Sequence, residues 1–182
     1  MQPEVLESIA PFTGLEFRRA LGFFASGICI MTTLDEAGTP QGLTISSFAS
    51  LSLDPPLICW SLRRDAYLHA VYQSSRHFAV NILAAEQEEV SRRFATARID
   101  RFIDTTCAQG IAGLPLIHDS LAWLECAAEC SMPGGDHTIF VGRVLRCRTF
   151  DKTPLLHWRG RYLPVLAPML EQAHLALDYW WW

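Results

Sequence analysis

The chain has 182 residues, of which 50% are hydrophobic and 19% are charged, with a formal net charge of −4. This balance argues against a protein that binds nucleic acid or an anionic membrane surface, because such proteins depend on a basic field for their affinity. The length suits one well-buried domain, and the low charge content favours a buried subunit interface. We therefore expect one domain over residues 1–182, with a core at about 13–165 and a helical tail at 166–182.

The first residues, Met1–Glu7, carry acids where a secretory signal would carry a basic segment. We therefore expect a cytoplasmic protein, in which the six cysteines are reduced thiols. A zinc site is an alternative use of four of these side chains, but the gap between the first two lies in a strand-like run and there is no second close pair. Its ligands would be Cys126, Cys130, His137 and Cys147.

The first elements expected along the chain are a helix over 15–24 and a strand over 28–34. Thr13 is suited to cap the helix, because Glu16 follows at the capping-box spacing, and Gly27 is expected to end it. The segment 35–38 then has the composition of a turn that leads back into a second strand.

The second strand, over 42–53, has a period-2 pattern that separates its residues onto two different faces. One face carries hydroxyl groups around one aromatic ring, and the other carries mainly apolar side chains suited to a core. Such a hydroxyl face fits a polar, planar ligand, and it also fits an ordinary solvent-facing strand. The polar face consists of Thr44, Ser46, Phe48, Ser50 and Ser52, and the apolar face of Leu43, Ile45, Ala49, Leu51 and Leu53, with Ser47 among them.

The prolines Pro55 and Pro56 end this strand, since neither can donate to a ladder. Further strands are expected over 57–62, 78–83, 122–131, 138–149 and 161–165, and helices over 67–74 and 86–97. Strands dominate and neighbouring strands pair locally. The pattern therefore predicts a mainly β, antiparallel barrel with peripheral helices in preference to a doubly wound sheet.

A second chemical signal is the turn Pro133–His137, which opens directly into an apolar strand. The glycines Gly134 and Gly135 allow a ligand to approach the backbone closely. At the rim of a barrel, His137 can stack on a ring or donate a hydrogen bond. A glycine hairpin with a solvated histidine is the simpler alternative.

Taken together, several segments resemble the short-chain flavin reductase family in order and spacing, over about nine tenths of the chain. They are 17–20 (FRRA), 26–33 (SGICIMTT), 42–48 (GLTISSF) through Pro56, 93–95 (RFA) and 135–142 (GDHTIFVG). The resemblance implies an FMN-binding split barrel that forms a homodimer. It also implies binding of FMN or FAD, reduction of that flavin by NADH or NADPH, and supply of reduced flavin to a separate monooxygenase.

Carried over by matching position, the resemblance assigns residues to three parts of the site. The flavin would lie along the hydroxyl segment and the next strand, its phosphate near two arginines, and the pyridine ring of the nicotinamide against His137. The chain departs from the family after Arg64, where residues 65–68 contain no serine or threonine. The cofactor-binding candidates are Thr44, Ser46, Ser47, Phe48, Ser50, Ser52, Pro55, Pro56, Ser61, Arg64, Arg93, Gly135 and Asp136, and the catalytic candidate is His137.

Hydride transfer between two stacked rings requires positioning and exclusion of water, and it needs no catalytic nucleophile. The function that the resemblance implies is an NAD(P)H:flavin oxidoreductase that serves a partner oxygenase, and we expect no metal site. Two alternatives remain: a flavin-binding module without turnover, and a flavoprotein that retains its flavin to reduce another acceptor. The pattern does not distinguish FMN from FAD, and Trp180–Trp182 lie outside the resemblance.

Overall fold

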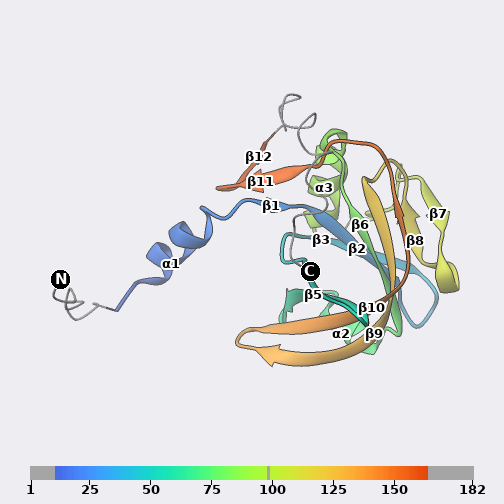
Figure 1. The fold of residues 1–182 in the computed structure, drawn as a ribbon, viewed down its shortest axis with the longest axis horizontal. Helices are drawn as coiled ribbons and strands as arrows, with labels where there is room; N and C mark the ends of the chain where they lie inside the picture. The colour runs from blue at the N-terminus through green and yellow to red at the C-terminus, as the bar shows by residue number, and fades with distance from the viewer. Residues whose placement is uncertain (1–10, 98, 164–182) are drawn as a thin grey trace.

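The computed structural model describes residues 11–97 and 99–163. Figure 1 shows a strand-rich body from which one short helix extends. The helices are α1 (Gly14–Leu21), α2 (His69–Ser74) and α3 (Glu88–Ala95), with 3-10 turns at Ala85–Gln87 and Ile111–Gly113. The strands are β1 (Ser26–Gly27), β2 (Cys29–Leu34), β3 (Pro40–Ile45), β4 (Ala49–Leu53), β5 (Pro56–Arg63), β6 (His77–Ile82), β7 (Cys107–Gln109), β8 (Pro115–Ile117), β9 (Ala122–Gly134), β10 (His137–Thr149), β11 (Leu156–Trp158) and β12 (Arg161–Leu163).

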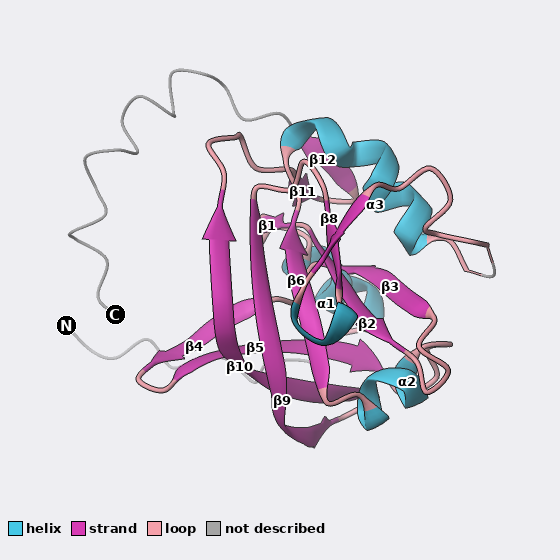
Figure 2. Cartoon of the chain, turned by 90° about the vertical axis from the view of Figure 1, so that its right-hand side faces the viewer, coloured by secondary structure: helices cyan, strands magenta, loops and turns pink. Residues whose placement is uncertain are grey.

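The main sheet is antiparallel and has seven strands in the order β3-β2-β6-β9-β10-β5-β4. Its two edge strands, β3 and β4, are consecutive in the chain and are joined by three residues, Ser46–Phe48. In a flat sheet with strands about 4.8 Å apart, these edges would be separated by roughly 29 Å. The four Cα steps from Ile45 to Ala49 span at most about 14 Å. The sheet must therefore curl, and it does so into the expected split β-barrel (Figure 2).

The continuous strand expected over 42–53 is wrong. It is divided into β3 and β4, and residues 46–48 cross from one edge of the barrel to the other. A β-bulge between Ser50 and Ser52 also breaks the alternation in β4, because an extra residue there has no cross-strand partner. Leu51 and Leu53, expected in the core, are 51% and 68% exposed, and Ala49 and Ser50 ahead of the bulge are exposed as well, since β4 is an edge strand.

Aromatic side chains fill the interior of the barrel. The ring of Trp60 on β5 stacks on Phe140 of β10, with centroids 4.7 Å apart, and meets Tyr72 of α2 edge-on at 5.0 Å. The Tyr72 hydroxyl donates to the carbonyl of Met31 on β2 at 2.7 Å, which satisfies its polar group. Helix α2 is one of the expected peripheral helices, and it packs against the interior cluster through Tyr72.

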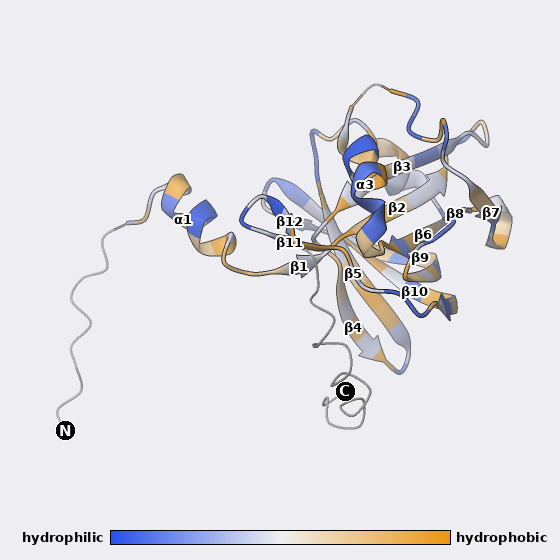
Figure 3. Ribbon diagram, turned by 90° about the horizontal axis from the view of Figure 1, so that it is seen from above, coloured by the Kyte–Doolittle hydropathy of each residue, from blue (hydrophilic) through white to orange (hydrophobic). Residues whose placement is uncertain are grey.

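The capping box expected at the first helix is confirmed. The Thr13 hydroxyl accepts from the Glu16 backbone N–H, and the Glu16 carboxylate accepts from the Thr13 backbone N–H. The helix ends at Leu21, earlier than expected, with Gly22 as its C-cap. All of its residues are exposed, and it projects away from the barrel with both hydrophobic and hydrophilic positions along its ribbon (Figure 3).

Several smaller expectations also changed. The helix expected over 86–97 is a 3-10 turn followed by α3, which ends at Ala95, and strands β7, β8 and β11 were not expected at all. No helix within residues 11–97 and 99–163 is long and apolar enough to cross a membrane. The tail expected at 166–182, including Trp180–Trp182, lies outside the described residues.

We predict that Gly142→Ala destabilises the barrel by about 1–3 kcal/mol, because overpacking a close-packed core forces its neighbours apart. A Cβ at Gly142 on β10 would collide with the Phe78 ring, which is only 3% exposed. Urea unfolding of wild type and variant measures the difference. Gly27→Ala is the control, since a Cβ at Gly27 meets nothing within 4 Å. Equal stability losses in the two variants would contradict this account of the packing.

Candidate flavin and nicotinamide site

Strand β5 brings most of the candidate residues together. Its neighbour on one side is β10, where His137 pairs with Arg63 and Ile139 pairs with Ser61. On its other side is β4, and beyond the start of β4 the Ser47 hydroxyl bonds to the Ser61 backbone. The crossover and His137 therefore flank the end of β5, two strand spacings or roughly 10 Å apart.

The residues of this end of β5 alternate between two faces of the sheet. Trp60 and Leu62 point into the core, with 1% and 8% exposure, so Ser61 and Arg63 belong to the outer face. His137 is their cross-strand neighbour on that face. The candidate site is thus a surface on the outside of the barrel, next to the crossover.

The hydroxyl segment does not form one straight row. Ser46 and Ser47 are exposed in the crossover, Ser50 is exposed on β4, and Ser52 is half-buried after the bulge. Phe48 packs against the interior cluster that contains Trp60. These positions present hydroxyl groups at the split edge of the barrel.

Thr44 is held away from this surface. Its hydroxyl donates to the carbonyl of Ser91 on α3 at 2.7 Å, and its side chain is partly buried. The hydroxyl therefore fastens β3 to α3, and the prediction that it contacts flavin remains untested.

The turn between β9 and β10 holds the histidine. Gly135 has φ +68°, a left-handed conformation that glycine adopts without strain. Nδ1 of His137 lies 2.7 Å from Oδ1 of Asp136. Because an ionised carboxylate can only accept, Nδ1 carries a proton and donates it to this bond.

This contact also changes the titration of the carboxyl group. The hydrogen bond from His137, followed by its positive charge and more weakly by that of Arg63, holds the pKa of Asp136 below its ordinary value. Asp136 is therefore an ionised partner that orients the ring.

The two candidate arginines lie in different places. Arg64 is exposed just beyond β5, and its backbone N–H donates to the Asp136 carbonyl at 3.0 Å, which joins the two turns. The Arg93 guanidinium on α3 donates to the Ile103 carbonyl at 2.6 Å and to the Thr105 hydroxyl at 3.0 Å. The Arg93 side chain is thus bound within its own domain, and the assignment of both arginines to the flavin phosphate stays a prediction.

Pro55 and Pro56 lie at the other end of the β4–β5 hairpin. Pro56 pairs with Leu53, seven residues before Arg63, so roughly 24 Å of strand separates it from the His137 end. The structure does not bring these prolines to the imidazole.

Arg63 was missed by the sequence analysis, which selected Arg64. Arg63 is the cross-strand partner of His137, and its guanidinium forms an exposed ion pair with Asp65 at 2.5 Å. The alternation of side chains along a strand would have found Arg63, because Arg63 shares a face with Ser61 and Arg64 does not.

Two other features lie away from this surface. The four residues of the alternative zinc site do not converge: Cys126 pairs with Val144 and Cys130 with Val141, and no metal-binding group of three or more ligands occurs in the described part of the chain. A cavity of about 440 Å³ lies beside α3 and contains none of the candidate residues; among its lining residues are Glu86, Asp104, His118, Asp119 and Lys152.

Comparison with known proteins identifies the family. The model of the flavin reductase like domain matches residues 21–166. This chain belongs to that family. The split-barrel fold and the resemblance seen in the sequence are thereby confirmed.

Individual flavin reductases are similar over most of their length. The chain is 40% identical to FMN reductase (NADH) SmoA of Agrobacterium fabrum over 146 residues, covering 80% of this chain and 83% of that one. It is 36% identical to the reductase component of the 4-nitrophenol 4-monooxygenase/4-nitrocatechol 2-monooxygenase of Rhodococcus opacus, over 89% and 85% of the two chains. Among solved structures, the NADH:FAD oxidoreductase SgcE6 of Streptomyces globisporus, in complex with NAD and FAD fragments, matches with a TM-score of 0.82 and 34% identity, over 88% and 98%.

For this flavin reductase-like chain we predict that His137→Ala raises the pKa of Asp136 toward an ordinary value, because the largest cause of its lowering is removed. Carboxyl carbon NMR during a pH titration measures it. Asp35 is the internal control, since its pKa is lowered mainly by the Thr39 backbone N–H and is independent of His137. An unchanged Asp136 midpoint would mean that the ion pair does not form in solution.

Proposed function

We propose that this protein is an NAD(P)H-dependent flavin reductase that reduces FMN or FAD and releases the product to a partner monooxygenase. The observation that supports it most is the pairing of an oriented imidazole with a neutral, hydroxyl-lined crossover across one strand, β5. The relatives support the same direction, since one is named for NADH and FMN and another as a monooxygenase reductase component.

The donor set fits a flavin. The Ser46 and Ser50 hydroxyls are exposed and neutral, which suits the carbonyl-rich edge of the ring. When bound, the flavin supplies the ring that accepts a hydride from reduced nicotinamide. Preorganised neutral donors can stabilise negative charge that develops on that ring.

His137 would serve the nicotinamide side. Asp136 holds its ring in one orientation through Nδ1, so the other edge and the face of the ring remain available to a ligand. Its side chain is 37% exposed, so it can contact a bound molecule without rearrangement. Its contribution is to position the donor, because hydride transfer requires no proton from the protein.

The mode of binding favours release. The candidate residues form an open surface on the outside of the barrel with few charged groups, of which Arg63 is paired with Asp65 and His137 with Asp136. An open, weakly charged surface suits a flavin that exchanges, which favours a diffusible product over a retained cofactor.

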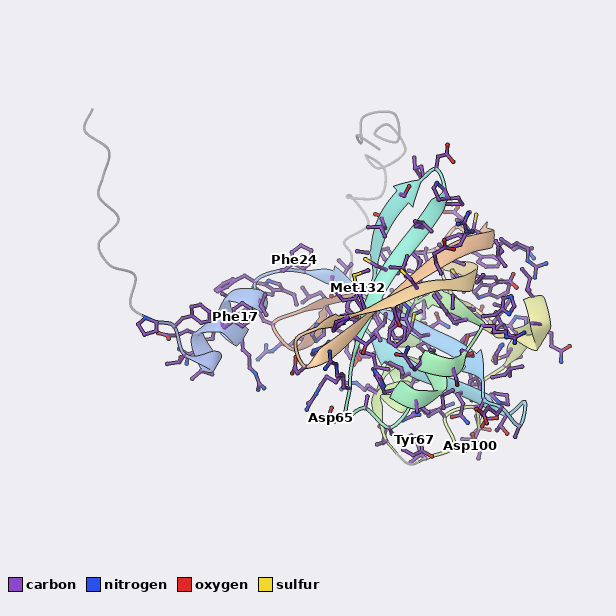
Figure 4. The ribbon with its side chains drawn as sticks, turned by 90° about the horizontal axis from the view of Figure 1, so that it is seen from below. Phe17, Phe24, Asp65, Tyr67, Asp100 and Met132 are labelled. Atoms are coloured by element: carbon purple, nitrogen blue, oxygen red, sulfur yellow. The ribbon has the colours of Figure 1, made fainter. Side chains whose placement is uncertain are left out.

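We further propose a homodimer. Helix α1 has eight residues, too few for a stable isolated helix, and it exposes Leu15, Phe17 and Leu21 at 61%, 50% and 57%. The segment that follows α1 is held by β11 and the next turn: the Trp158 indole N–H donates to the Phe23 carbonyl, and the Arg159 guanidinium lies over the Phe23 ring. Figure 4 shows Phe17 on α1 and Phe24 on the segment after it, both outside the barrel. A second copy would cover this apolar face.

A cytoplasmic location and a single domain over the whole chain complete the proposal. The six cysteines are free thiols, and disulfides are typical of secreted proteins. The family match over residues 21–166 gives no boundary inside the barrel.

We predict that the purified protein oxidises NADH or NADPH only when FMN or FAD is added. His137→Ala should lower kcat at least about tenfold and change the flavin Kd by no more than about threefold, because it removes contacts on the nicotinamide side. Stopped-flow kinetics measures the turnover, and calorimetry measures the flavin Kd.

Two results would count against this function. Wild-type protein that binds no flavin would contradict the enzyme assignment. A His137→Ala variant with normal turnover would show that the imidazole is only a solvated side chain of the turn.

Release of the product is tested separately. A flavin-dependent monooxygenase is held behind a dialysis membrane that passes flavin. Hydroxylated product there would support release of reduced flavin, whereas flavin that stays bound and reduces another acceptor would contradict it.

The dimer has its own test. Leu15→Glu combined with Leu21→Glu should convert a dimer into a monomer in sedimentation velocity, because charge is buried at the proposed contact. Ile103→Glu, at a residue that is 59% exposed on the barrel body, is the control and should stay dimeric. A monomeric wild type with full turnover would rule out the dimer.

A further inference from the structure

The Ser47 side chain replaces a backbone partner in the sheet. Its hydroxyl donates to the Ser61 carbonyl at 2.9 Å and accepts from the Ser61 N–H at 3.1 Å. The β4–β5 register pairs Ala49 with Cys59, so its continuation sets residue 47 opposite residue 61. In a regular antiparallel pair, two backbones exchange these two bonds. Here one hydroxyl makes both.

The backbone of the crossover is consequently left without sheet partners. In the part of the chain that the structure describes, no hydrogen bond joins the N–H or C=O groups of residues 46–48 to another residue. Two side chains hold the segment instead: Ser47 on β5, and Phe48 against the interior cluster. Ser46 and Ser47 are exposed, so these polar groups face solvent or a ligand.

We propose that Ser47 is a positioning residue for the flavin. By holding the crossover on β5 through its side chain, it leaves the N–H groups of residues 46–48 and the Ser46 hydroxyl free to bind the ligand. The inference rests on the proposed function and revises one part of it. The Ser47 hydroxyl has already used its only hydrogen, so it cannot donate to the flavin as the sequence analysis expected.

The arrangement separates ligand binding from folding. If the hydroxyl is removed, water can satisfy the Ser61 N–H and C=O groups, because this part of the site is exposed. The barrel then keeps its core, and the crossover loses one of its two anchors. A flavin would have to order that segment on binding, which lowers its affinity.

The test uses full-length protein. We expect Ser47→Ala to weaken FMN and FAD binding at least about tenfold by calorimetry, with kcat at saturating flavin within about threefold of wild type, because only the ordering step is affected. Hydrogen exchange should accelerate at the Ser61 amide and stay slow at Val80 in the barrel centre. Ser47→Thr keeps the hydroxyl and should restore both readings.

Ser74→Ala is the matched control, because the Ser74 hydroxyl also donates to backbone carbonyls, those of Ala70 and Val71, at the end of α2. It should leave flavin affinity unchanged. Wild-type affinity in folded Ser47→Ala, or an equal loss in Ser74→Ala, would overturn the inference. If Ser47→Ala does not fold, a Ser47→Thr variant whose Ser61 amide stays protected but which binds flavin tenfold more weakly would overturn it as well. Wild-type protein that binds no flavin would defeat the proposed function, and the Ser61 amide exchange in Ser47→Ala would still report whether the hydroxyl holds the crossover.

Discussion

The rest of the structure depends on one topological constraint: β3 and β4 are the two edges of a seven-stranded sheet and are joined by only three residues. So short a connection forces the sheet to curl until its edges approach. The edges do not pair with each other, so the barrel remains split along this line. The split is also where the backbone of residues 46–48 lacks sheet partners, and therefore where polar groups are available to a ligand.

The curl of the sheet also determines which side chains fit inside the barrel and which helix packs on it. A tight barrel brings rings against backbone, and glycine is required where they meet: a Cβ at Gly42 would approach the Phe94 ring of α3 within 2.7 Å, and one at Gly142 would collide with Phe78. The same closeness lets the Thr44 hydroxyl reach the Ser91 carbonyl, which fixes α3 beside β3. Helix α3 thus packs next to the start of the crossover, and the packing of the core and the shape of the site have one cause.

The sequence predicted the elements better than the site geometry. Strand periodicity and the Thr13–Glu16 spacing located most strands and the first helix, because these signals are local. The division of residues 42–53 into two strands was not predictable from the pattern, since alternation continues across a crossover whose position depends on the far edge of the sheet. The exposure of Leu51 was missed for the same reason, since β4 lies at the edge of the sheet. The alternation along β5 places Arg63 on the face of Ser61, but its pairing with His137 depends on a register that two separate segments determine.

The electrostatics of the site follow from this geometry as well. Two charged side chains near the end of β5 have a partner within two residues: Arg63 has Asp65, and His137 has Asp136. Such exposed pairs contribute little to stability, since solvent screens them, but they fix the direction of a side chain. Within residues 11–97 and 99–163, the neutral backbone groups of the crossover have no hydrogen-bond partner. A surface that orients its charges locally and offers neutral donors discriminates by hydrogen-bond geometry more than by net charge. This suits a ligand that must bind in two redox states of different charge and then leave.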